Sequence, residues 1–211
     1  MHTSFRILVL AAVAAACGAA HAEGLTFKAG VIRYQPDSRT SGLTGIGIPP
    51  GADAKVGSAN TALFTIEYEL QPHWGAELVL GVPPKITSTA TGSVAFLGEV
   101  LSARNVAPTL LFTYRWGQAG ATWRPYVGIG INYTKFTDAK SPQGYDVKLS
   151  DSTGPAAEAG VDYAIDKRWG LFASIGYAQV RSKLVATGAN VLQTTIDFRP
   201  TTYAFGASYK F

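Results

Sequence analysis

Alternation of apolar and polar side chains is the dominant pattern along this chain, and it is clearest at the carboxyl terminus. Tyr203, Phe205, Ala207, Tyr209 and Phe211 alternate there with small or polar residues. Successive side chains of a β-strand point to opposite faces, so these five residues share one face. A face with this much aromatic surface is typical of a membrane barrel strand, with lipid outside and a polar interior.

The same alternation predicts an all-β chain with eight strands. The expected ranges are about 25–35, 60–70, 74–83, 106–116, 124–136, 156–165, 169–181 and 198–211. In the second strand, Phe64 and Ile66 fall on one face and Glu67 and Glu69 on the other. Because charged residues fall on the face away from the aromatics in strand after strand, we expect an outward apolar face and an inward polar face.

The connections between the expected strands alternate in length. Short connections fall at 71–73, 117–122 and 166–168, and long ones at roughly 36–59, 84–105, 137–155 and 182–197. Outer-membrane barrels have short periplasmic turns and long extracellular loops. The pattern therefore predicts an eight-stranded antiparallel transmembrane β-barrel with both ends of the barrel chain on the periplasmic side.

Tryptophan placement supports this orientation. Trp74, Trp116, Trp123 and Trp169 each border one of the three short connections. An indole ring is stable at the boundary between lipid and water, so we expect these four residues to form an aromatic girdle. The alternative is that they are core residues of a soluble barrel.

The amino terminus has the features of a secretory signal peptide over residues 1–22. Arg6 is followed by an apolar run and then by the small-residue site Ala20-His21-Ala22. A barrel domain would then occupy residues 23–211, without Cys17 and hence without disulfides. The alternative is a lipoprotein cleaved before Cys17.

Composition narrows the class further. The formal net charge is +4, and it falls to +3 when Arg6 leaves with the signal, which is too small to suggest a nucleic-acid partner. No later segment approaches the ~18–20 apolar residues that a spanning helix needs. If the chain lives in a membrane, it must do so as a closed barrel.

Several segments resemble the outer membrane protein W (OmpW) family. They are 105–116, 124–136, 160–169 and the Phe211 ending, and the Pro-Tyr-Val-Gly-x-Gly-x-Asn-Tyr-Thr stretch at 125–134 is the most specific. The resemblance implies a barrel in a Gram-negative outer membrane and, for several members, passive uptake of small hydrophobic molecules. It also implies that Tyr209 and Phe211 belong to a signal read by the barrel-assembly machinery. The chain departs from the family pattern at 82–86, where it reads Val-Pro-Pro-Lys-Ile.

The barrel interior sets limits on function. Eight strands enclose just enough space for side chains or one small ligand, so a wide aqueous pore is not expected. The charged residues expected inside are Glu67, Glu69, Glu77, Arg115, Glu158, Asp162 and Lys210. Opposite charges there would have to pair to offset desolvation. One alternative is that such a network has no role beyond stabilising the barrel. An apolar solute would have to use the outer half and the long loops.

The first long connection contains aliphatic residues where polar ones are expected. Leu43, Ile46 and Ile48 could line a hydrophobic mouth above the barrel, or they could cover its rim or contact lipid.

Catalysis is not expected, because His73 is the single histidine after the signal and falls in a predicted periplasmic turn. No residue spacing indicates a metal or a cofactor. Two functions stay open: passive uptake of small hydrophobic molecules, and a non-transporting barrel that acts as a structural protein, adhesin or receptor through its loops. The expected surroundings are outer-membrane lipid and lipopolysaccharide, whereas the solute and the oligomeric state are left open.

Overall fold

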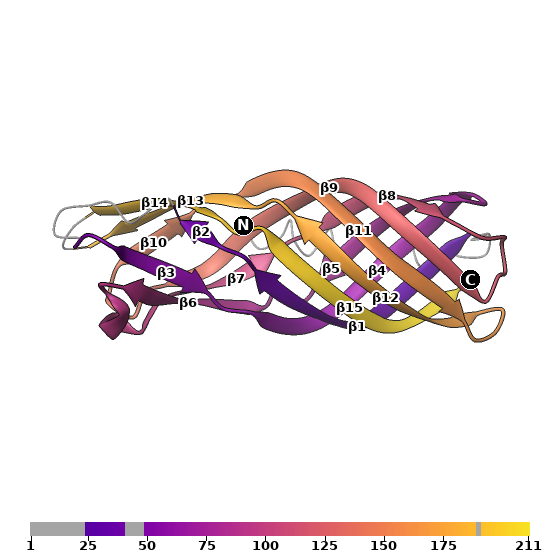
Figure 1. The fold of residues 1–211 in the computed structure, drawn as a ribbon, viewed down its shortest axis with the longest axis horizontal. Coiled ribbons are helices and arrows are strands. Elements are labelled where there is room, and N and C mark those ends of the chain that lie inside the picture. Colours follow the sequence, from indigo (N-terminus) through magenta and orange to yellow (C-terminus); the bar gives the residue numbers. More distant parts are fainter. Residues whose placement is uncertain (1–23, 41–48, 189–190) are drawn as a thin grey trace, which may run out of the picture.

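The computed structural model describes residues 24–40, 49–188 and 191–211, which lie mostly in antiparallel β-strands (Figure 1). Eight strands close into a barrel, which confirms the fold class expected from the sequence. In chain order and in neighbour order they are β1 (Leu25–Pro36), β4 (Ala59–Gln71), β5 (Trp74–Gly81), β8 (Thr109–Arg115), β9 (Trp123–Lys140), β11 (Ser152–Ala164), β12 (Trp169–Ala178) and β15 (Pro200–Lys210). The barrel is closed by β1 and β15, whose pairing begins at Thr26 and Lys210 and ends at Pro36 and Pro200.

Exposure alternates along the barrel strands in the sense expected for lipid outside. Ile129 and Phe205 are 69% and 57% exposed on the outer face, whereas Lys28 and Glu77 are 1% and 2% exposed inside. A barrel folded in water would bury its aliphatic and aromatic side chains and expose its charges. The observed arrangement is that of a membrane barrel.

The three short turns lie at the end of the barrel that holds the carboxyl terminus (Figure 1). In the turn between β11 and β12, the backbone N–H groups of Trp169 and Arg168 donate to Asp166 Oδ1 at 2.8 and 2.7 Å. These two hydrogen bonds favour the ionised carboxylate, so they hold the pKa of Asp166 below its ordinary value. This side chain thus supports the turn together with the backbone N–H groups of Ile165 and Asp166, which donate to the Trp169 carbonyl at 2.9 and 3.1 Å.

At the other end, the long connections fold into further strands instead of irregular loops. These are β2 (Arg39–Thr40), β3 (Ala52–Val56), β6 (Lys85–Gly92), β7 (Glu99–Val106), β10 (Asp146–Leu149), β13 (Arg181–Thr187) and β14 (Val191–Asp197), with a short 3-10 helix η2 (Ala95–Leu97). One sheet runs β3-β6-β7-β9 and the other β10-β13-β14-β2. The two sheets form an extension beyond the barrel (Figure 1). Among the described residues, no helix is long and apolar enough to cross a membrane.

The extension forms because hairpins of the barrel continue past the membrane in nearly the same register. Val56 pairs with Ser88 in β3 and β6, just as Leu63 pairs with Gly81 in β4 and β5. Both ladders therefore belong to one long hairpin, bent where pairing lapses between them. A pattern of glycine, serine and threonine predicts loops, and here register continuity overrides that local preference.

Glycines mark two sharp corners of the barrel. A Cβ on Gly30 would meet the Phe205 carbonyl oxygen of the paired strand, and one on Gly206 would meet the Ala29 carbonyl oxygen. On the opposite side of the barrel, a Cβ on Gly130 would meet the Leu110 carbonyl oxygen. Only glycine allows neighbouring backbones this close, so these positions set the curvature of the sheet.

We expect Gly130→Ala to lower the free energy of unfolding by about 1–3 kcal/mol, because the added methyl group must push two strands apart. Gly81→Ala is the matched control, since the nearest atom to its Cβ, the Ala62 carbonyl oxygen, is 3.7 Å away. Urea unfolding in lipid vesicles measures both variants. Equal losses of stability would contradict the corner assignment.

Candidate functional site

Buried ion pairs close the lumen in the half of the barrel nearer the short turns, called here the lower half. They form one cluster, called here the ion-pair floor, from Lys28 on β1, Glu67 on β4, Glu77 on β5, Arg115 on β8 and Asp162 on β11. The Lys28 Nζ atom lies 3.1 Å from Glu67, 3.0 Å from Asp162 and 3.9 Å from Glu77. The Arg115 guanidinium contacts the same three carboxylates and donates to Thr113 Oγ1 at 2.8 Å. Five strands are thus tied together across the lumen.

Tyr126 packs against both cations of the floor. Its ring centroid lies 4.7 Å from Lys28 Nζ and 5.0 Å from the Arg115 guanidinium carbon, and its hydroxyl donates to Glu158 at 2.8 Å. The residue is 1% exposed. An aromatic face stabilises a desolvated cation, so Tyr126 compensates part of the cost of burying the two charges.

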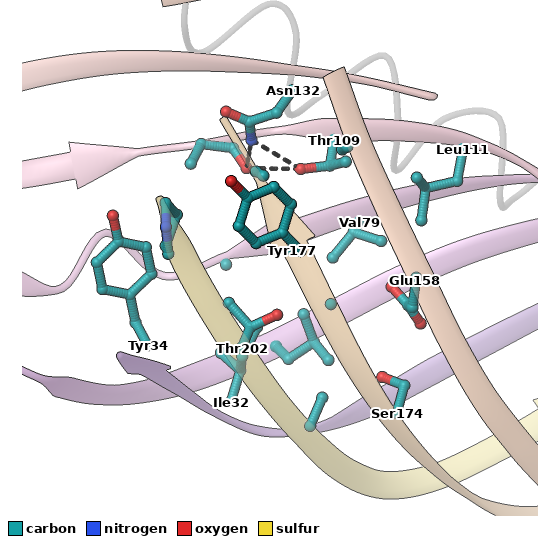
Figure 2. Close-up of a pocket in the computed structure, with 18 of the residues that line it drawn as sticks. Ile32, Tyr34, Val79, Thr109, Leu111, Asn132, Glu158, Ser174, Tyr177 and Thr202 are labelled. Carbon is teal, nitrogen blue, oxygen red and sulfur yellow. Dashed lines mark hydrogen bonds between the residues drawn. The ribbon is translucent and has the colours of Figure 1, made fainter. Parts of the chain in front are cut away.

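Above the floor, the barrel encloses an inner cavity of about 110 Å³. Figure 2 shows Ile32, Val79 and Leu111 around this cavity, with Tyr34 and Glu158 towards opposite ends. Its lining is mainly apolar, in contrast to the charged floor beneath.

Some polar groups of the inner cavity are occupied by one another, whereas the Tyr34 hydroxyl and Asn105 Oδ1 have no hydrogen-bond partner among the described residues. Asn132 Nδ2 donates to Thr109 Oγ1 at 2.8 Å, and Thr134 Oγ1 donates to Asn132 Oδ1 at 2.7 Å (Figure 2 shows the first bond). An amide and a hydroxyl that already have partners hold water or a polar solute less strongly. The cavity therefore presents a mainly apolar surface to a solute, with two polar atoms left to accept or donate a hydrogen bond.

A hydrophobic wall covers the inner cavity on the extracellular side. It consists of Tyr34, Val56, Ile86, Val180, Ile196 and Phe198, all buried. Phe136 packs against it, with its ring 5.3 Å from that of Phe198. Tyr34 and Val180 also line the inner cavity, so this wall is its roof.

An outer cavity of about 260 Å³ lies beyond the wall, between the two sheets of the extension. Val100 and Leu101 line it from β7, and Val147, Leu184 and Leu192 from β10, β13 and β14. Val56 and Ile196 of the hydrophobic wall line it too. The hydrophobic wall therefore separates two stacked cavities, both mainly apolar.

Strand pairing lapses beside the inner cavity. The ladder of β5 with β8 ends at Val79 and Thr109, and that of β6 with β7 begins at Lys85 and Arg104. Between them lie residues 82–84 and 106–108, called here the proline seam, with prolines at 83, 84 and 108. Proline has no N–H to donate to a ladder.

The proline seam borders the inner cavity directly, because Pro84 and Ala107 line that cavity. The backbone bond from the Asn105 N–H to the Pro84 carbonyl, 3.2 Å long, joins the two segments at one end of the seam. This part of the barrel wall has few backbone hydrogen bonds to break.

The sequence matches the OmpW family over residues 22–211. The chain belongs to the OmpW family. Outer membrane protein W of Vibrio cholerae is 32% identical over 216 residues, 97% of each chain. PahQ of Pseudomonas aeruginosa, a dibenzothiophene metabolism operon protein, is 28% identical over 140 residues, 66% of this chain and 64% of PahQ.

A solved structure agrees with this assignment. The crystal structure of OprG from Pseudomonas aeruginosa matches with a TM-score of 0.84 at 29% identity, over 90% of this chain and 97% of OprG. This OmpW-family barrel is therefore an outer-membrane protein, with its extension on the extracellular side.

The charged residues expected inside the OmpW-family barrel fall into three places. Glu67, Glu77, Arg115 and Asp162 lie in the ion-pair floor, and Glu158 meets it through Tyr126. Glu69 and Lys210 lie below the floor, 3.1 Å apart, in a polar cavity of about 480 Å³ at the periplasmic end. Arg124 Nη1 lies 3.3 Å from the other oxygen of Glu69.

Sequence reasoning missed Lys28, Tyr126 and Arg124. Lys28 alternates with Phe27 and Ala29 in an expected strand, and this alternation could have placed it inside. Tyr126 is in phase with the inward Gly128 and Gly130, so alternation could have placed it inside too, but not beside the cations that pack on it.

The four tryptophans lie on the outer face at the periplasmic end, between 40% and 61% exposed. Trp169 packs edge-to-face on Tyr209 at 4.9 Å, and Tyr209 on Phe211 at 5.0 Å. The Phe211 N–H donates to the Leu25 carbonyl at 3.0 Å, which fixes the chain end at the closing edge. The recognition of Tyr209 and Phe211 during assembly stays a prediction.

Two other expectations fall outside the described residues. Leu43, Ile46 and Ile48 lie in the gap at 41–48, and the expected signal peptide lies within 1–23. Pro49, the first described residue after that gap, lines the outer cavity. Within the described part of the chain, no three His, Cys, Asp or Glu side chains are placed to hold a metal ion.

We expect Lys28→Met to lower the free energy of unfolding by about 3–5 kcal/mol, because it leaves buried carboxylates with one cation fewer. Lys167→Met, in an exposed periplasmic turn, removes the same charge without a buried partner. Urea unfolding of both variants in vesicles provides the comparison. A loss for Lys28→Met no larger than for Lys167→Met would show that the floor adds no stability.

Proposed function

We propose that this OmpW-family barrel lets small hydrophobic molecules enter the outer membrane passively. The solute binds first in the outer cavity, crosses the hydrophobic wall by side-chain rotation, occupies the inner cavity and leaves sideways through the proline seam into lipid. The observation that best supports this proposal is the position of the inner cavity. A charged floor lies beneath it, and beside it lies a stretch of barrel wall with few backbone hydrogen bonds.

The ion-pair floor directs the solute sideways. An apolar molecule that continued downwards would have to displace Lys28 or Arg115 from their carboxylates, and separating buried ion pairs is costly. Leaving through the proline seam requires only the parting of strands that exchange few hydrogen bonds. Beyond the seam the solute reaches the acyl chains just inside the lipid boundary, which are as apolar as the cavity, so the exit step needs no energy source.

Partitioning drives the entry step. Each Å² of apolar surface moved from water into the outer cavity gains about 25 cal/mol. Catalysis is not required, and we propose that the protein is not an enzyme. The relative PahQ supports the substrate class, since dibenzothiophene is an apolar aromatic compound and PahQ belongs to an operon for its metabolism.

We expect Ala156→Phe to reduce uptake of a hydrophobic fluorescent probe in whole cells to the level of cells that lack the protein. Ala156 is 7% exposed and lines the inner cavity, so a phenyl ring there fills the space. Ala159→Phe, on the lipid face of the same strand, is the matched control and should leave uptake unchanged. Heat-modifiable mobility verifies that both variants fold.

A polar probe of similar size serves as a second control and should enter equally in all strains. If cells without the protein take up the hydrophobic probe as fast as wild-type cells, the uptake proposal is wrong. A structural, adhesive or receptor role of the extension would then be favoured. If only Ala156→Phe is without effect, the inner cavity is not on the path.

The expected mouth is tested separately. Replacing Leu43, Ile46 and Ile48 together by serine should slow uptake of the same probe, because the first apolar contact is lost, while the amount of folded barrel stays constant. Serine substitutions at Thr87, Thr89 and Thr137, of which Thr89 is exposed and the other two are half-buried, form the control triple. Unchanged uptake in the Leu43/Ile46/Ile48 variant would remove this segment from the mechanism without affecting the cavities.

A further inference from the structure

Three exposed cations cluster on the outer face of neighbouring strands β6, β7 and β9. Lys85 pairs directly with Arg104, and Val106, two residues further along β7, pairs with Lys135. All three cations are exposed. Asp138 lies 3.5 Å from Arg104 Nε, so three positive charges face one negative charge. The patch is net positive.

The cluster lies at the outer boundary of the lipid belt. Trp123 and Tyr133 are on the outer face of β9, ten residues apart. Ten residues at ~3.3 Å each, tilted by about 40°, span roughly 25 Å, the height of the apolar belt of a membrane barrel. Lys135 follows Tyr133 by two residues and therefore lies just outside the belt.

The other two cations are at the same height. Lys85 is eleven residues from Trp74, and Arg104 is twelve residues from Trp116, as Lys135 is from Trp123. Each of these three chain segments, 74–85, 104–116 and 123–135, thus has an indole ring at its periplasmic end and a cation at its extracellular end. Anionic phosphates of the outer-leaflet glycolipid lie at the level where acyl chains meet sugars.

We propose that Lys85, Arg104 and Lys135 form a binding site for a phosphate group of lipid A, the membrane anchor of lipopolysaccharide. Arginine offers a planar fork of donors to phosphate, and the two lysines add point charges. At Arg181, twelve residues from Trp169 along the chain, the excess is smaller. Arg181 and Arg199 share Asp197, at 3.8 and 2.9 Å, so two cations meet one anion there. The cluster on β6, β7 and β9 is therefore the favoured position.

The site adjoins the proline seam. Arg104 Nη1 donates to the Pro83 carbonyl at 3.2 Å, so a phosphate bound to Arg104 places one lipid beside the seam. Binding of lipid A follows from charge and height alone, and it does not depend on uptake.

The test measures lipid A binding to the folded mature chain in micelles by native mass spectrometry. Lys85→Gln/Arg104→Gln/Lys135→Gln should bind diphosphorylated lipid A about tenfold more weakly or worse, because each cation near a membrane surface contributes to anion binding. The matched control, Lys148→Gln/Lys167→Gln/Lys183→Gln, loses the same charge at exposed positions elsewhere and should bind as the wild type does. Asp138→Asn should strengthen binding, since it removes the acid beside Arg104.

The phosphate is tested by changing the ligand. Dephosphorylated lipid A should bind wild type and cluster variant equally, and inorganic phosphate alone should not compete if the lipid anchor is required. Competition by inorganic phosphate at equal concentration would overturn the lipid source, leaving a free-anion site. Equal weakening in the cluster and control variants, or equal affinity for lipid A with and without phosphates, would overturn the site itself.

Discussion

Lys28 and Arg115 contact the carboxylates of Glu67, Glu77 and Asp162 in the middle of the barrel, and the rest of the interior is arranged around these ion pairs. Each group alone would be too costly to bury, so the five side chains depend on one another. Because they occupy the lumen, they separate the mainly apolar inner cavity from the polar cavity at the periplasmic end. Space for an apolar molecule exists only above them, and the hydrophobic wall divides that space into two cavities.

The position of the proline seam follows from the same membrane constraint that requires a closed barrel. Unpaired carbonyl groups in the centre of the lipid would be very unfavourable. The seam lies next to Lys85 and Arg104, close to the extracellular boundary, where headgroups and water can reach the free groups and where Arg104 donates to Pro83. A weak stretch of barrel wall is tolerated there, and on the proposed path a solute would leave through it into the upper part of the lipid.

Sequence alone predicted the eight strands and their faces, because lipid imposes a strict two-residue period on positions such as Phe64, Ile129 and Phe205. It also placed the tryptophans at one boundary between lipid and water, because each of them borders a short turn. It did not predict the strands of the extension, where register continuity between pairs such as Val56 with Ser88 outweighs composition. Alternation along one strand could have placed Lys28 and Tyr126 inside, but not the contacts they make, because their partners lie on other strands across the lumen.

The inward face of this barrel changes character with height, and this change is what a two-residue pattern conceals. On β1, Lys28, Ile32 and Tyr34 all point inward, yet they belong to the ion-pair floor, the inner cavity and the hydrophobic wall in turn. The same order recurs on β4, where Glu67 lies in the floor and Leu63 in the cavity. Alternation fixes which residues face the lumen, but height along the strand determines what each can bind. The proposed passage for apolar solutes therefore depends on aliphatic residues at inward positions on the extracellular side of the floor.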